Sequence, residues 1–166
     1  MQGFTKMTTD NKTVDLINDY VLSNTAVTKE SLSAELNDLF TTCQSAISEP
    51  AKLGVLLRNA AHYKKNLTEA QFSELSSNAE VLLKDLTTFS NTLSSIKTEQ
   101  EELLKLDLPI DVLQISAFDI SNSYTNWTER FVHVVIPVAT TISSLIQLSI
   151  NNESLSKATP NENVPS

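Results

Sequence analysis

The chain has 166 residues, of which 40% are hydrophobic and 19% charged, and its formal net charge is −8. This length suits one domain, with a core large enough to be stable without disulfides or bound metal ions. The chain has a single cysteine, Cys43, which excludes an intrachain disulfide. The acidic balance without a Lys/Arg cluster excludes a nucleic-acid-binding protein, and two glycines leave little room for hairpins or phosphate-binding loops.

The first part of the chain is predicted to hold a leader and one short helix. Residues 1–9 are expected to be a flexible leader, and they lack the apolar stretch of a signal peptide. Without a signal peptide or disulfides, a cytoplasmic location is favoured. From Asp10 to about Ser23 the spacing predicts a short helix, whose apolar face holds Val14, Ile17 and Val21.

The next helix is predicted to begin at Thr28, an N-cap residue flanked by Val27 and Leu32 at hydrophobic-staple spacing. Its apolar stripe alternates steps of four and three residues, through Leu32, Leu36, Leu39, Cys43, Ala46, Pro50, Leu53, Leu57 and Ala60. Pro50 lacks a backbone N–H and clashes with the preceding turn. The sequence therefore predicts either a sharp kink there or two helices, 28–48 and 50–65.

A capping box, Thr68-Glu69-Ala70-Gln71, predicts the start of a long helix over residues 69–106. Its heptad stripe has one polar member, Gln100, among Phe72, Leu75, Ala79, Leu82, Leu86, Phe89, Leu93, Ile96 and Leu103. Such a regular stripe predicts packing against other helices along the whole length.

A second long helix is predicted after Pro109. The heptad stripe continues through Leu113, Ala117, Ile120, Tyr124, Trp127, Phe131, Val134, Val138, Thr141, Leu145 and Leu148. Pro137 is expected to kink this helix. Residues 151–166 are polar and are predicted to form a mobile tail after a single helical-bundle domain, 10–150.

The fold class predicted from these elements is all-α: an antiparallel bundle of long heptad-patterned helices with a short N-terminal helix and proline kinks near 50 and 137. Short connections make neighbouring helices antiparallel. Antiparallel helices can be aligned by counting residues away from the turns near 67 and 108. This alignment places Pro50 and Pro137 at a similar level along the bundle axis, so the bundle is expected to bend there.

The motifs of helical-bundle metalloenzymes are missing from the sequence. A di-iron site needs Glu-x-x-His pairs, but Asn59 precedes His62 by three residues and Arg130 precedes His133. No Gly-x-Ser-x-Gly elbow or P-loop is present. The sequence thus predicts no enzyme and no catalytic, cofactor-binding or metal-binding residue, and Cys43 is interpreted as a small core hydrophobe.

Charge is absent from residues 131–150, and this uncharged stretch is long enough to span a bilayer. A central helix buried by its neighbours gives the same pattern and is the favoured interpretation. A second uncharged stretch, 86–96, is rich in hydroxyl side chains.

The function expected from these patterns is a non-enzymatic interaction or scaffold module, which binds a protein partner or copies of itself through helix faces. A heptad stripe indicates that a helix packs against another helix, but not whether that helix belongs to the same chain. Three such stripes in one chain favour packing of these helices against each other. The alternative is a membrane-active bundle that inserts residues 131–150. No nucleic acid or cofactor is expected in either case.

Overall fold

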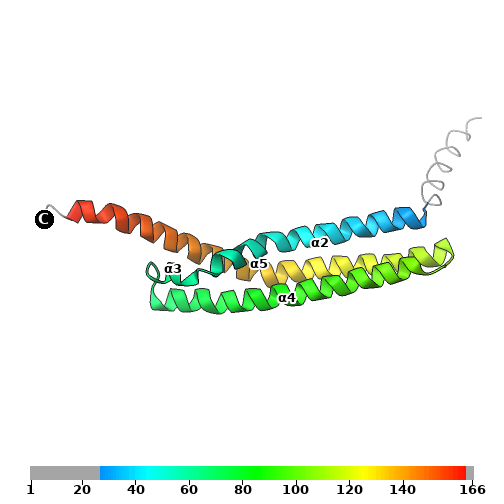
Figure 1. The fold of residues 1–166 in the computed structure, drawn as a ribbon, viewed down its shortest axis with the longest axis horizontal. Helices are drawn as coiled ribbons and strands as arrows, with labels where there is room; N and C mark the ends of the chain where they lie inside the picture. Colours follow the sequence, from blue (N-terminus) through cyan, green and yellow to red (C-terminus); the bar gives the residue numbers. More distant parts are fainter. Residues whose placement is uncertain (1–26, 164–166) are drawn as a thin grey trace, which may run out of the picture.

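The computed structural model describes residues 27–163, which form four helices (Figure 1). These are α2 (Lys29–Leu57), α3 (Ala60–Lys64), α4 (Glu69–Lys105) and α5 (Ile110–Asn163). The described residues contain no strand, so the predicted all-α bundle is confirmed. The leader 1–9 and the short helix predicted over 10–23 lie outside the described residues.

Three long helices make the bundle. α4 runs antiparallel to both α2 and α5, which also pack on each other, and short α3 closes the end where α2 stops (Figure 1). One continuous core runs between the three long helices, and its deepest members include Leu36, Leu75, Leu113 and Ile142.

Both predicted helix starts are confirmed by their capping geometry. The Thr28 side chain accepts a hydrogen bond from the Ser31 backbone N–H at 3.1 Å, and the Thr28 N–H donates to the Ser31 hydroxyl at 2.9 Å. Thr68 and Gln71 form the same reciprocal pair at the start of α4. Each box satisfies two backbone donors that a helix start leaves unpaired.

Pro50 lies inside α2, which continues without interruption to Leu57. The two-helix alternative with a break at residues 48–50 is therefore wrong; the chain breaks later, between Leu57 and Ala60. Inside a helix a proline removes one backbone hydrogen bond, here to the Ala46 carbonyl, and α2 continues despite this loss.

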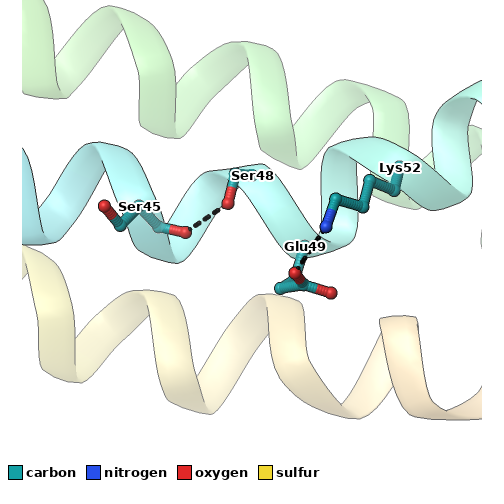
Figure 2. A network of polar contacts seen from close by, with 4 residues as sticks. All are labelled: Ser45, Ser48, Glu49 and Lys52. Atoms are coloured by element: carbon teal, nitrogen blue, oxygen red, sulfur yellow. Dashed lines mark hydrogen bonds and ion pairs between the residues drawn. The ribbon is translucent and has the colours of Figure 1, made fainter.

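Side chains on either side of Pro50 make local polar contacts (Figure 2). The Ser48 hydroxyl donates to the Ser45 carbonyl at 2.7 Å, and Lys52 pairs with Glu49 at 2.7 Å. The ion pair is largely exposed, at 70% and 77% for its two side chains, so it adds little stability.

α5 changes direction between its yellow and orange parts in Figure 1, and its sequence contains Pro137. Proline is a common cause of such a bend. Beyond residue 150 the helix continues to Asn163 and projects past the α3 end of the bundle (Figure 1). Much of the segment predicted as a polar tail is thus helical.

The buried stripe of α5 follows the prediction up to Phe131 and then moves by one residue. Val135, Ile142 and Ser149 are 0%, 0% and 1% exposed, whereas the predicted stripe residue Val134 is 42% exposed. Three consecutive four-residue steps, 127–131–135–139, replace the heptad's alternation. Such a break in the heptad spacing locally unwinds the supercoil.

Two polar contacts hold α3 and the following turn against α5. The Ser149 hydroxyl donates to the Tyr63 carbonyl at 3.3 Å, and the Asn152 amide donates to the Asn66 carbonyl at 2.9 Å. Ser149 is buried, so its bond also satisfies a hydroxyl that would otherwise destabilise the core.

Candidate interaction surfaces

A polar layer, buried at Gln100 and Tyr124 and exposed at Asn37, joins the three long helices. Gln100 of α4 is 1% exposed; its amide nitrogen donates to Asn37 Oδ1 of α2 at 2.7 Å, and its oxygen accepts from the Tyr124 hydroxyl of α5 at 2.6 Å. Lys97 also donates to Asn37 Oδ1. Because every polar atom of the Gln100 side-chain amide group finds a partner on another helix, the layer fixes the register of the helices.

Cys43 lies in the core, as predicted, and is 2% exposed. Its Sγ lies 3.5 Å from the Thr128 hydroxyl and 3.9 Å from the Tyr124 carbonyl. Burial raises the pKa of the thiol, and the contact with Thr128 opposes that shift only in part. A buried thiol with a raised pKa is a poor nucleophile, which supports a packing role.

The histidines do not assemble a metal site in the described part of the chain, which contains no cluster of three His, Cys, Asp or Glu side chains able to hold a metal ion. His62 lies on α3, edge-on to Tyr63, and His133 lies exposed on α5. The geometry therefore gives no starting point for metal chemistry at either position.

An aromatic cluster connects α4 and α5. Phe89 stands edge-on to both Trp127 and Phe131, with ring centroids 5.7 and 5.4 Å apart, and the Trp127 and Phe131 rings stack at 5.0 Å. Trp127 Nε1 donates to the Phe89 carbonyl at 2.9 Å. The indole is therefore held in one orientation by a hydrogen bond and by stacking.

Above this cluster lies a surface groove of about 280 Å³ between α4 and α5. Buried Phe89, Ile96 and Trp127 form its floor, and Thr92 and Arg130 stand on its exposed rim. The uncharged stretch 86–96 noted in the sequence supplies the α4 wall. Sequence periodicity located the floor, but only the pairing of α4 with α5 places Arg130 beside it.

A second surface lies on the C-terminal half of α5, along a different side of the helix. Val132, Ile136 and Ile150 are 49%, 40% and 45% exposed on the uncharged segment 131–150. The favoured prediction, in which neighbours cover most faces of this segment, is wrong on this side. The reason is that this side of α5 faces away from both α2 and α4, the two long helices that pack against it.

A third apolar area lies near the turn between α4 and α5. Ile115 and Phe118 are 68% and 65% exposed, and Leu106 is 52% exposed. These residues stand outside the predicted stripes, so heptad spacing could not single them out.

Comparison with known proteins adds no information about these surfaces, since no protein-family model, curated protein or solved structure matches this chain.

Proposed function

We propose that the protein is a non-enzymatic interaction module, and that its docking surface is the α5 face formed by Val132, Ile136, Thr140, Ser143 and Ile150. The occupant that we propose is the same face of a second copy. The observation that supports this is the exposure of three branched apolar side chains on a helix segment without charge.

The spacing of this docking face is self-complementary. Val132 and Ile150 are separated by five turns of about 3.6 residues, so they lie on the same side of α5, although the helix changes direction between its yellow and orange parts. In an antiparallel pair centred near residue 141, Val132 of one copy lies opposite Ile150 of the other. The small side chains of Thr140 and Ser143 then lie at the crossing point, where they permit a close approach.

Charge also favours this face over the rest of the surface. Two copies that each carry −8 repel one another, and the repulsion is strongest where acidic side chains meet. Between Arg130 and Glu153 the chain has no charged residue, so contact there brings no like charges together.

The expected dimer is weak. A helix face of about 27 Å by about 10 Å covers about 270 Å² per copy, less than the roughly 800 Å² of a standard interface. The test is therefore sedimentation velocity of the full chain over a concentration series that reaches the high micromolar range. The expected result is a sedimentation coefficient that rises with concentration.

Two substitutions on α5 give a matched comparison. Ile136→Glu places a charge on the docking face, and Val134→Glu places the same charge two residues away, on another side of the helix. The two residues are similarly exposed, at 40% and 42%, so both variants should fold. Loss of association in Ile136→Glu alone supports the proposal, whereas equal association of all three proteins contradicts it.

A second candidate function is membrane insertion by the same segment. α5 contains an 18-residue window that is long and apolar enough to cross a bilayer, and only 33% of that window is buried in the bundle. One such helix is also typical of a soluble core, but here most of the window is uncovered. Flotation with neutral liposomes at pH 7 and pH 5 tests this candidate.

The same two variants separate the candidates. Insertion of α5 into lipid would bury all of its sides, so Val134→Glu and Ile136→Glu should weaken liposome binding equally. Association between copies uses one side, and only Ile136→Glu should weaken it. Flotation of the unmodified protein that both variants abolish would favour the membrane function.

A further inference from the structure

The groove over Trp127 combines an apolar floor with one cationic rim residue. We propose that it is a binding site for a small amphipathic carboxylate, such as a medium-chain fatty acid, with the acyl chain over Trp127 and Phe89 and the carboxylate at Arg130. The groove lies between α4 and α5, and about 200° around the α5 axis separates Arg130 from Val132. This inference is therefore independent of the proposed docking face.

The floor offers apolar contact without a deep cavity. Phe89, Ile96 and Trp127 are 8%, 7% and 3% exposed, and each contributes to the lining of the groove. The hydrogen bond from Trp127 Nε1 to the Phe89 carbonyl occupies the polar atom of the indole. The floor thus presents carbon surface, which suits an alkyl chain better than a polar ligand.

The threonines on the α4 rim have their hydroxyl protons already engaged. Thr88 donates to the Lys84 carbonyl at 3.1 Å, and Thr92 donates to the Thr88 carbonyl at 2.9 Å. Their oxygens remain acceptors, which do not bind a carboxylate. An anionic group in the groove is therefore directed away from the α4 wall and towards the cation on α5.

Arg130 is free to bind an anion. In the described part of the chain its guanidinium forms no ion pair within 4 Å and no hydrogen bond, and its side chain is exposed at the rim. The planar guanidinium matches a carboxylate with two parallel N–H donors. An uncharged ligand of the same length would leave this interaction unused.

The size of the groove limits the ligand. A groove of about 280 Å³ suits a short acyl chain that lies along its floor. Octanoate, whose eight carbons include the carboxylate carbon, is the probe that we choose. Octanol has the same chain without the charge.

The experiment is a titration of the full chain with octanoate, followed by tryptophan fluorescence and by equilibrium dialysis. Trp127 is the single tryptophan of the chain, so its emission reports on the groove alone. The expected result is a saturable change in emission, with one octanoate bound per chain, and weaker binding of octanol. Dialysis counts bound ligand directly, so absence of saturable binding by dialysis overturns the proposal.

Three variants locate the site. Arg130→Gln should weaken octanoate binding about tenfold, which corresponds to about 1.4 kcal/mol, and leave octanol binding unchanged. Arg58→Gln, at the other arginine of the chain, should bind octanoate as the unmodified protein does. Thr92→Phe fills the groove and should abolish binding of both probes.

The same variants can also show that octanoate does not bind in this groove. Thr92→Phe and Arg130→Gln both change exposed residues, and circular dichroism with thermal unfolding checks that each is folded. If folded Thr92→Phe binds octanoate with unchanged affinity, the ligand does not lie in this groove. If Arg58→Gln and Arg130→Gln weaken binding equally, the effect is one of net charge and the assignment of Arg130 is wrong.

Discussion

The hydroxyl of Tyr124 on α5 donates a 2.6 Å hydrogen bond to Oε1 of Gln100 on α4, and each residue is only 1% exposed. The same Gln100 side chain donates from its nitrogen to Asn37 on α2. One glutamine thereby connects all three long helices. A one-residue slip of any helix would break the connection and leave a buried polar atom without a partner.

The first prediction concerns the energy of this bond. Tyr124→Phe leaves Gln100 Oε1 buried and unpaired, and should lower the free energy of unfolding by about 1–3 kcal/mol. Gln100→Leu leaves the Tyr124 hydroxyl unpaired, with a similar cost. The double variant removes both polar groups and should cost less than the sum of the two. Urea denaturation of the four proteins gives the coupling energy. Additive effects would show that the two side chains do not interact.

The second prediction concerns alkaline pH. Burial, followed by repulsion from Cys43 and Glu101, raises the pKa of Tyr124 from 10.0 to about 12. The folded protein therefore holds the Tyr124 proton more tightly than the unfolded chain does. This contribution to stability is complete below pH 10 and is lost as the pH rises to about 12, with a size of up to roughly 3 kcal/mol.

Tyr124→Phe provides the control for the pH dependence. Apart from Cys43, which interacts with Tyr124, the groups that titrate at alkaline pH have the same surroundings in both proteins. The difference between the two unfolding free energies therefore reports on Tyr124 and its interaction with Cys43. That difference should be constant up to pH 10 and shrink above it. A constant difference up to pH 12 would contradict the assignment of the raised pKa.

The third prediction tests the one-residue move of the α5 stripe. Val135 is 0% exposed and Val134 is 42% exposed, although strict heptad spacing buries Val134. Val135→Asp should lower the melting temperature strongly, because it places a carboxylate in the core. Val134→Asp should change the unfolding free energy by about 0.5 kcal/mol or less. If Val134→Asp destabilised the protein more than Val135→Asp, the heptad spacing would continue unbroken through α5.

The fourth prediction compares the two helix prolines. Pro137 is exposed and lies inside α5, where a proline costs about 3 kcal/mol relative to alanine. Pro137→Ala should therefore stabilise the protein against denaturant. Pro50 is buried, so Pro50→Ala gains a backbone donor but loses packing, and its net effect should be smaller. A destabilised Pro137→Ala protein would mean that the bend is needed to seat α5 against α3.

The sequence by itself determined the local features of the fold. The capping boxes at Thr28 and Thr68 each involve residues three apart, so their geometry depends on no distant contact. The stripe of α4 was predictable throughout, including the burial of Gln100, because this helix contacts other helices over its whole length. Heptad spacing reports burial accurately wherever a helix has constant neighbours.

Tertiary structure decided where the neighbours change. Pro50 by itself predicts the end of a helix. In the structure its ring is buried, and α2 continues past it to Leu57. The arrangement of α2 and α4 around α5 leaves Val132 and Ile136 on the uncovered side, and it buries Val135 in place of Val134. The groove beside Arg130 likewise needs α4 and α5 side by side. Contacts such as Trp127 with Phe89 join residues 38 apart in the chain, and periodicity within one helix carries no information about which helix lies opposite.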